Sequence, residues 1–161
     1  MTPDELFAPL NLPPFKYNII RENGMLKIWD IIRQRYIKLT PEESVRQHFV
    51  HWLINDLNYP SSLISNEIGI ELNGTKRRCD SVVFNTKGVP SMIIEYKAPH
   101  IKITQSVFDQ ILHYNLVLQV PYLIISNGIN HYCCLLNIHK REYTFLSSVP
   151  NFEIISRGFS E

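Results

Sequence analysis

The stretch Ser91-Met92-Ile93-Ile94-Glu95-Tyr96-Lys97 lies near the middle of the chain and changes in character along its length. Its first half is apolar on both faces, as in a strand buried inside a sheet. Its second half brings in Glu95 and Lys97, which are two residues apart and therefore project from the same face of a strand. Ionisable groups at the end of a buried strand are costly unless they are paired or used in chemistry. The stretch therefore predicts a buried strand that ends at a functional site.

Further strands are expected on both sides of this stretch, because short runs of strand-forming residues are separated by turn signals. Asn73-Gly74 and residues 85–88 are such signals, and each predicts a hairpin. The run at 122–126 is continuously apolar, as in a central strand buried on both faces. Besides residues 91–97, strands are predicted at 67–72, 77–84, 122–126 and 131–136, with an edge strand near 143–146.

Two helices accompany these strands. Thr40 is a suitable N-cap, Pro41 fits the first helical position, and Glu43 completes a Thr-x-x-Glu capping box. Apolar residues then recur at helical spacing to about Asn58, and a second helix is expected over 104–118. The order α-β-β-β-α-β mixes hairpins with one helical crossover. It predicts a mixed α/β (α+β) fold with a central mixed sheet flanked by helices. One core between helices and sheet is expected to contain Phe49, Leu53, Ile94, Ile111, Leu123 and Ile125.

Length and composition favour a single compact domain. The chain has 161 residues, of which 45% are hydrophobic and 19% charged, close to an ordinary globular protein. Residues 1–39 are expected to form an N-terminal leader and hairpin extension, with residues 1–15 as a loose leader and a turn at Glu22-Asn23-Gly24. Residues 40–161 are expected to form the main domain.

The net charge of +1 argues against strong general affinity for polyanions, so any nucleic-acid site must be a local patch. The three cysteines, Cys79, Cys133 and Cys134, do not make a disulfide framework and are expected to be buried and unreactive. Neither a signal-peptide pattern nor a membrane-spanning apolar stretch is visible. The expected location is cytoplasmic.

The hairpin around residues 85–88 brings a second carboxylate toward Glu95. If Phe84 pairs with Val89, Asp80 falls opposite Ile93, one diagonal step from Glu95 and within reach of a shared cation. Two carboxylates on one sheet face suit Mg²⁺, which prefers carboxylate oxygen, water and substrate phosphate as ligands. Such a set predicts metal-assisted chemistry on a phosphate. An exposed salt bridge between strands is the structural alternative for the same residues.

Five features follow one another in the order typical of a known nuclease fold: residues 40–47, Asp80, residues 95–99, Gln110 and Tyr114. In this respect the chain resembles the PD-(D/E)XK nuclease superfamily. More narrowly, it is similar to the N-terminal nuclease domain of the restriction (R, or HsdR) subunit of type I restriction enzymes, and to stand-alone bacterial proteins with such a domain. The resemblance covers roughly residues 16–136 and implies a restriction-endonuclease-like αβββαβ core.

The resemblance implies roles for individual residues. Asp80 and Glu95 would hold Mg²⁺ or Mn²⁺, and Lys97 would be the motif lysine that stabilises charge on the phosphate or orients the attacking water. Glu43 falls where such nucleases place a helical acidic residue beside the metal, although a capping-box glutamate needs no catalytic role. The superfamily's proline before the aspartate is absent, since Cys79 precedes Asp80.

Gln110 and Tyr114 match the Gln-x-x-x-Tyr motif of the restriction-subunit nucleases, and their spacing puts them on one helix face. Gln110 would be directed toward the Glu95–Lys97 end of the strand. Phosphates of a bound strand are expected to be held by Lys76, Arg77, Arg78 and Lys102. A solvated charged face would explain these basic residues nearly as well. His48 and His51, three apart on the first helix, are interpreted as surface or groove-lining residues rather than metal ligands.

The sequence thus predicts a Mg²⁺-dependent endodeoxyribonuclease that hydrolyses DNA phosphodiester bonds, with DNA and other restriction-modification subunits as partners. No Walker A pattern is present, so the chain lacks the ATP-driven translocase of complete restriction subunits. The alternative function is a non-catalytic nucleic-acid-binding or assembly module that retains the nuclease fold.

Overall fold

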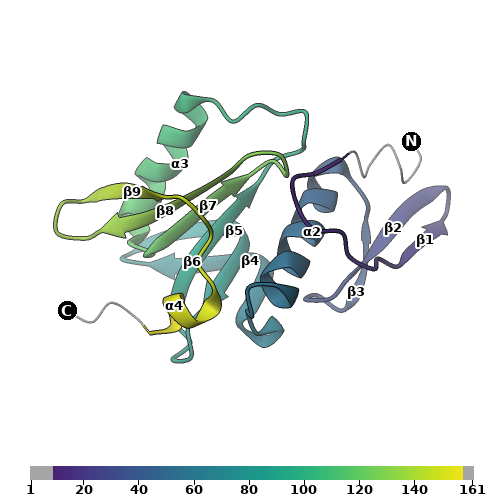
Figure 1. Ribbon diagram of the computed structural model, residues 1–161, viewed down its shortest axis with the longest axis horizontal. Coiled ribbons are helices and arrows are strands. Elements are labelled where there is room, and N and C mark those ends of the chain that lie inside the picture. The colour runs from purple at the N-terminus through teal and green to yellow at the C-terminus, as the bar shows by residue number, and fades with distance from the viewer. Residues whose placement is uncertain (1–8, 158–161) are drawn as a thin grey trace.

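A six-stranded mixed sheet forms the centre of the molecule in the computed structural model, which describes residues 9–157 (Figure 1). Only the pairing of β6 with β7 is parallel among its ladders; the others are antiparallel. Helices α2 (Pro41–Asn55) and α3 (Gln105–Leu118) flank the sheet. This arrangement confirms the predicted α/β fold. The strands, in spatial order, are β4 (Ile64–Leu72), β5 (Thr75–Phe84), β6 (Pro90–Tyr96), β7 (Tyr122–Ser126), β8 (His131–Asn137) and β9 (Glu142–Leu146).

A second, three-stranded antiparallel sheet precedes the first helix, and α2 lies between the two sheets (Figure 1). Its first hairpin turns at Asn23-Gly24, as the sequence predicts, and both turn residues have positive φ. The strands are β1 (Ile19–Glu22), β2 (Met25–Asp30) and β3 (Arg35–Lys38). Two further short elements, η1 (Ser61–Leu63) and α4 (Phe152–Ser156), were not predicted.

Both long helices begin where their capping residues indicate. The hydroxyl of Thr40 accepts a hydrogen bond from the backbone N–H of Glu43 at 3.0 Å, and Thr104 caps α3 in the same way. The first helix ends at Asn55, three residues before the predicted Asn58. The second ends at Leu118, and its C-cap residue Gln119 adopts a left-handed conformation with φ of 59°.

The register of the β5–β6 hairpin differs from the predicted one. Asp80 was expected opposite Ile93, and this is wrong by two residues. Phe84 pairs with Pro90 and not, as predicted, with Val89, which shifts the register by one residue. A β-bulge beside Phe84 shifts the pairing of the rest of β5 by a second residue. Continuing the observed ladder brings Asp80 alongside Glu95 instead of one diagonal step away.

Apolar side chains form two cores on the large sheet, one on each face, and a third, smaller cluster contains Ile28 and Leu39. The prediction of a single core is therefore wrong. Because β6 and β7 are buried on both faces, neighbouring residues such as Ile93 and Ile94 enter different cores. Cys133 and Cys134 separate in the same way, and all three cysteines are buried and free. The α2 side holds Phe49, Leu53 and Ile94, and the α3 side holds Leu123 and Ile125, with Ile111 partly buried against them.

The segment before the first strand packs on the main domain where the structure describes it. Leu10 and Leu12 lie against the α2-side core, and the backbone N–H of Asn11 donates to the carbonyl of Gly128 at 2.8 Å. A Cβ on Gly128 would lie 2.9 Å from the side chain of Leu10, and its φ of 83° also favours glycine. Residues 9–15 are therefore held in place rather than loose; residues 1–8 lie outside the described part.

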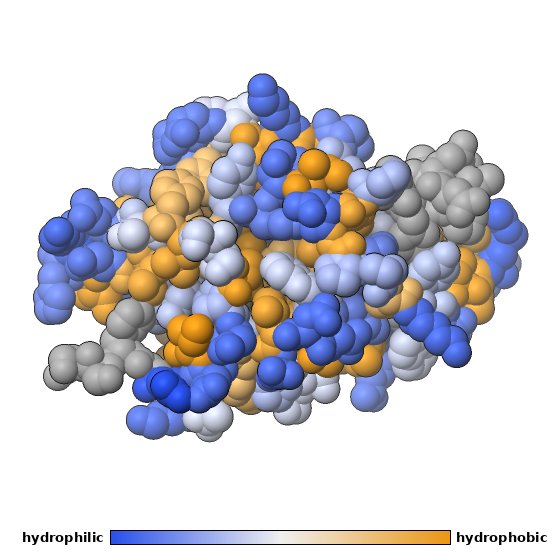
Figure 2. Space-filling view, in the orientation of Figure 1, coloured by the Kyte–Doolittle hydropathy of each residue, from blue (hydrophilic) through white to orange (hydrophobic). Residues whose placement is uncertain are grey.

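Figure 2 shows hydrophilic side chains spread across one face of the molecule, with apolar residues between them. Within residues 9–157, no helix combines the length and the apolar character needed to cross a membrane.

Candidate functional site

Two carboxylates from adjacent strands lie together at one end of the large sheet. Asp80 is on β5, and Glu95 is the second-last residue of β6. The backbone N–H of Tyr96 donates to Oδ2 of Asp80 at 2.9 Å, which fixes that carboxylate against the end of β6. The side chains of Asp80 and Glu95 retain 24% and 15% of their exposure, so both are within reach of a ligand although largely buried.

Glu95 is the group whose protonation is most affected by this arrangement. Burial raises the pKa of Glu95 to about 8; the charge of Arg77 opposes this shift, while Asp80 adds to it by charge and by a side-chain hydrogen bond. Near neutral pH the pair therefore retains a proton. A cation bound between the two carboxylates would compete with that proton.

Lys97 follows directly after β6, and its backbone N–H donates to the carbonyl of Ser126 on the neighbouring strand at 2.8 Å. Its side chain is half-buried and makes no ion pair with the residues that the structure describes. The positive charge of Lys97 lowers the pKa of Glu95 and also that of Glu42, against the rise that burial causes in both. The ammonium group is therefore close to the carboxylates without being neutralised by a partner.

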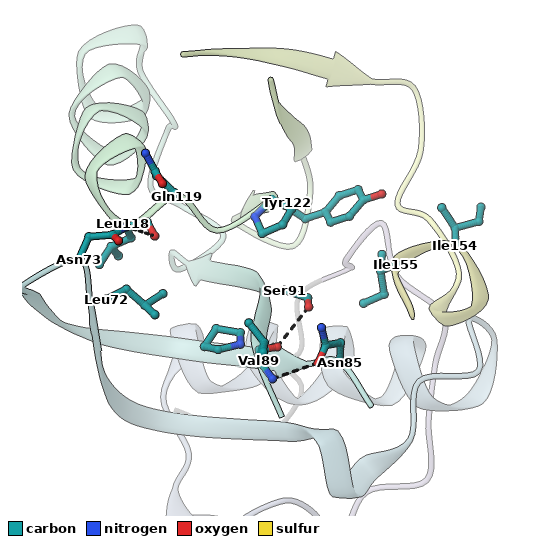
Figure 3. Close-up of a pocket in the computed structure, with 12 residues that line it drawn as sticks. Leu72, Asn73, Asn85, Val89, Ser91, Leu118, Gln119, Tyr122, Ile154 and Ile155 are labelled. Atoms are coloured by element: carbon teal, nitrogen blue, oxygen red, sulfur yellow. Dashed lines mark hydrogen bonds between the residues drawn. The ribbon is translucent and has the colours of Figure 1, made fainter. Parts of the chain in front are cut away.

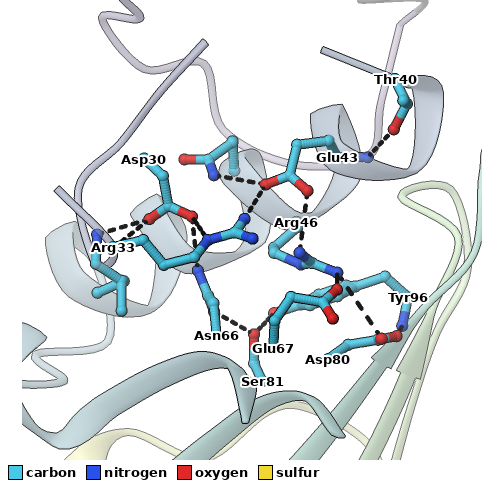
Figure 4. A network of polar contacts seen from close by, with 12 residues as sticks. Asp30, Arg33, Thr40, Glu43, Arg46, Asn66, Glu67, Asp80, Ser81 and Tyr96 are labelled. Carbon is cyan, nitrogen blue, oxygen red and sulfur yellow. Dashed lines mark hydrogen bonds and ion pairs between the residues drawn. The ribbon is translucent and has the colours of Figure 1, made fainter. Parts of the chain in front are cut away.

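A buried arginine connects helix α2 to Asp80 (Figure 4). The side chain of Arg46 is only 3% exposed. Its Nη1 lies 3.0 Å from Oε2 of Glu43, and its Nη2 lies 2.6 Å from Oε1 of Glu67 and 3.8 Å from Oδ1 of Asp80. Three carboxylates from three different elements thus share one guanidinium.

Glu43, expected beside the metal, occupies a buried position behind Arg46. Its carboxylate also accepts from Nη2 of Arg33 at 2.6 Å and from Nε2 of Gln47 at 3.0 Å. Burial, and then the charge of Asp80, raise the pKa of its neighbour Glu42. The structure thus links Glu43 to Asp80 through Arg46.

Glu67 on β4 was not predicted to belong to the site. It lies across from Asp80 in the β4–β5 ladder, and its φ of 53° is unusual for a strand residue with a side chain. Its carboxylate binds Arg46 and, at 3.0 Å, Nε of Arg78. An alternating polar and apolar pattern predicts only a solvent-facing glutamate here, so no sequence signal could have identified it.

On the α3 side, Arg77 lies between Glu95 and the motif tyrosine. Its guanidinium is ion-paired with Glu95 and lies 5.0 Å from the ring centroid of Tyr114. The Tyr114 hydroxyl donates to the carbonyl of Lys76. Gln110, one turn earlier on α3, is exposed and makes no hydrogen bond to another described residue. The structure thus brings Tyr114 to the carboxylates through Arg77 and leaves Gln110 open to a ligand.

The other basic residues named from the sequence lie at the surface. Lys76, Arg78 and Lys102 are exposed, whereas Arg77 is largely buried. A shallow groove of about 430 Å³ runs over this part of the β4–β5 hairpin, and Arg77 connects it to Glu95. It is lined by Gly69, Ile70, Glu71, Lys76, Arg77 and Arg78.

The next question is whether the side chains of the site provide enough ligands for a metal ion. No group of three His, Cys, Asp or Glu side chains placed to hold a metal occurs within residues 9–157. Two adjacent carboxylates fit Mg²⁺ or Mn²⁺ only if water and a substrate phosphate supply the remaining ligands, which is the usual situation for Mg²⁺. His48 and His51 do not contribute: Nδ1 of His48 lies 2.8 Å from the carbonyl of Ser44, and His51 stacks on Phe15.

A separate pocket of about 290 Å³ opens at the opposite end of the sheet, where β6 and β7 begin (Figure 3). Two of its polar side chains, Asn85 and Ser91, already have local hydrogen-bond partners. Oδ1 of Asn85 accepts from the backbone N–H groups of Lys87 and Val89, and the hydroxyl of Ser91 donates to the carbonyl of Val89. This pocket therefore offers no chemistry comparable to that of the carboxylate pair.

The fold and the site together have the character of a nuclease-related α/β domain. The family model described as type I restriction enzyme R protein N terminus matches residues 41–150. The match spans more than half of the chain, including both carboxylates and both long helices, so the chain belongs to this family. It is therefore a domain related to the type I restriction nucleases. No curated protein matches the chain.

Proposed function

We propose that this protein is a metal-dependent endodeoxyribonuclease that hydrolyses phosphodiester bonds in DNA. The observation that carries the proposal is the pairing of Asp80 and Glu95 on adjacent strands. Lys97 follows two residues after Glu95, and its ammonium makes no ion pair within residues 9–157. Family membership supports the same function. Asp80 and Glu95 would hold Mg²⁺ or Mn²⁺, which when bound supplies Lewis acidity to the scissile phosphate.

The chain's own residues divide the remaining tasks. Lys97 stabilises negative charge on the phosphate or orients the attacking water. Gln110 donates from its neutral amide to a phosphate oxygen, since its side chain is free of internal hydrogen bonds among the described residues. Tyr114 holds Arg77 in position. Glu43 acts as a positioning residue, because it fixes Arg46 against Asp80.

DNA is the proposed partner, and other restriction-modification subunits are proposed as further partners. The exposed basic residues named from the sequence support strand binding, since phosphate contacts need positive charge without base-specific groups. Lys76, Arg78 and Lys102 are available for this at the surface.

One observation favours the alternative of a non-catalytic module. Arg77 is paired with Glu95, and Arg46 lies close to Asp80, so both carboxylates already have a cationic neighbour inside the protein. A binding or assembly module that retains the nuclease fold would use these pairs only for stability. It would bind DNA or a protein partner without metal-dependent turnover.

A cleavage assay distinguishes the two functions. Purified protein is incubated with single- and double-stranded DNA in the presence of Mg²⁺ or Mn²⁺, with Lys97→Ala and Asp80→Asn as test variants. Lys87→Ala is a matched control, because Lys87 is exposed in the turn at the other end of β6. The nuclease proposal predicts cleavage by the parent and the control only. Equal cleavage by the test variants would show that the residues are wrongly assigned, and no cleavage with retained DNA binding would favour the module.

A further inference from the structure

Like Arg46, Arg77 is a basic residue of the site whose charge is largely buried, and it is the one that contacts Glu95. Its side chain is 10% exposed, and it lies between the carboxylate of Glu95 and the ring of Tyr114. One of its terminal nitrogens, Nη1, is buried and has no hydrogen-bond partner among the described residues. A buried guanidinium with an unused donor has the capacity to bind a second partner.

The next residue provides an internal comparison. Arg78 has the same side chain and also forms an ion pair, with Glu67, but its side chain is 74% exposed. Both arginines line the groove over the β4–β5 hairpin. Only Arg77 is tied to a carboxylate of the candidate metal pair. A substitution at Arg78 therefore controls for loss of one positive charge in the groove.

The groove itself leaves room for a nucleic-acid strand. Gly69 lies across from Arg78 on β4, and a Cβ built on it would meet nothing within 4 Å. A glycine inside a strand weakens the strand and often marks a place where another backbone approaches closely. Lys76, which is exposed, adds positive charge at the same place, although it lies 3.9 Å from the carboxylate of Glu71. The groove thus has free space above Gly69 and is lined by basic side chains, of which Arg77 contacts Glu95.

We propose that Arg77 exchanges partners when a divalent metal binds: it leaves Glu95 and takes a phosphate of the DNA strand lying in the groove. This inference rests on the proposed nuclease function and adds a specific role for one residue. In the metal-free protein Arg77 is the internal partner of Glu95. When Glu95 becomes a metal ligand, its charge is balanced by the metal, and the guanidinium is free for the next available anion.

Charge and geometry both support the exchange. A metal ion and the Arg77 guanidinium repel one another if both remain on Glu95, so departure of Arg77 lowers the free energy of the metal complex. The ring of Tyr114 supports the guanidinium in either position, because a cation–π contact leaves the edge of the group available for hydrogen bonds. A planar guanidinium also matches a phosphate through two parallel hydrogen bonds.

The first test measures metal affinity without DNA. Mn²⁺ binding at pH 8 is measured from the loss of the free-ion paramagnetic resonance signal, for the parent, Arg77→Met and Arg78→Met. Methionine retains the apolar stem of the buried side chain and removes only the cation. Arg77→Met is expected to bind Mn²⁺ about tenfold more tightly, because no internal cation competes for Glu95. Arg78→Met is expected to match the parent.

The second test measures DNA binding against salt concentration, with and without Mn²⁺, in a Lys97→Ala background that prevents cleavage. With metal, Arg77→Met is expected to reduce the slope of log K against log salt by about one, the loss of one phosphate contact. Without metal the slope should not change, because Arg77 is then occupied by Glu95. Arg78→Met should act equally in both conditions. Arg77→Lys, which keeps the charge, should restore most of the metal-dependent slope.

The outcomes separate this inference from the function on which it rests. If the parent binds Mn²⁺ but Arg77→Met binds it no more tightly, the exchange is wrong and the metal site stands. A slope change of the same size with and without metal would also overturn the exchange. If the parent binds no Mn²⁺ at all, both the exchange and the proposed nuclease function are wrong.

Discussion

The backbone N–H of Tyr96 donates a hydrogen bond to Oδ2 of Asp80 at 2.9 Å. This bond joins β6 to a side chain of β5 at the point where both strands reach the candidate site. It orients the Asp80 carboxylate without using its charge, since an amide oxygen could accept the same bond. The structural role and the chemical role of Asp80 can therefore be separated by substitution.

Asp80→Asn is expected to preserve stability, whereas Asp80→Ala is expected to lower it. Asparagine keeps an acceptor for the Tyr96 N–H, but alanine leaves this largely buried donor unpaired, which costs about 1–3 kcal/mol. Urea unfolding of the two variants measures the difference. Equal loss of stability in both would mean that the charge of Asp80, and its contact with Arg46, matters more than the hydrogen bond.

The stability of the metal-free protein should fall as the pH rises toward 8 because of Glu95. Its pKa is about 8 in the folded chain, against a value near 4.5 for an ordinary glutamate, so the folded state binds the proton more tightly. The corresponding stability, on the order of a few kcal/mol, is fully present below about pH 4.5 and is lost as the pH rises through 8.

Glu95→Gln isolates this contribution, because glutamine is neutral at every pH. The difference in unfolding free energy between parent and variant should change steadily between pH 5 and 8. Taking this difference removes the effect of His48, His51 and His131, whose lowered pKa values act in the opposite direction below about pH 6.5. A difference that is independent of pH would contradict the raised pKa.

Glu43→Ala is expected to destabilise the fold strongly, by about 3–5 kcal/mol, because it leaves the buried guanidinium of Arg46 without its closest helical partner. Arg33 and Gln47 lose an acceptor at the same time. Chemical denaturation measures the effect. Glu153→Ala, which breaks an exposed ion pair with Arg157, is the matched control and should change stability by less than about 1 kcal/mol. A similar small change in Glu43→Ala would contradict the network.

Gln110→Ala should reduce DNA cleavage or DNA binding while leaving the melting temperature almost unchanged. The side chain is exposed and makes no hydrogen bond within residues 9–157, so its loss costs the fold little. Tyr114→Phe should have a milder effect, because it loses the bond to the Lys76 carbonyl but keeps the ring under Arg77. Unaltered cleavage and binding by Gln110→Ala would remove Gln110 from the site.

Local signals in the sequence predicted the elements of the fold well. Thr40, Pro41 and Glu43 set the start of α2, and the Asn73-Gly74 turn and the apolar run at 122–126 set their strands. Such signals depend on residues close together in the chain, which is why they are readable without the structure. The register of β5 against β6 was predicted wrongly, because the bulge beside Phe84 leaves no mark in the amino-acid pattern.

The candidate site was only partly predictable, for a physical reason. Asp80 and Glu95 could be brought together from a hairpin turn, since both belong to adjacent strands. The partners of these carboxylates come from distant segments: Arg46 from α2 and Glu67 from β4. Arg46 and Glu67 meet beside Asp80 only because tertiary packing brings their elements together. In the sequence, their spacing does not differ from that of charged residues exposed to solvent, so it does not reveal the contact.

The central claim is that Asp80 and Glu95 together form one metal site, and a calorimetric titration with Mn²⁺ tests it most directly. The parent protein should bind one ion per chain and release a proton on binding near pH 7, because Glu95 carries one in the metal-free state. Proton release is measured by repeating the titration in buffers of different ionisation enthalpy. Asp80→Asn and Glu95→Gln should each abolish binding. Absence of binding by the parent, or binding by the parent that both variants retain, would contradict the claim.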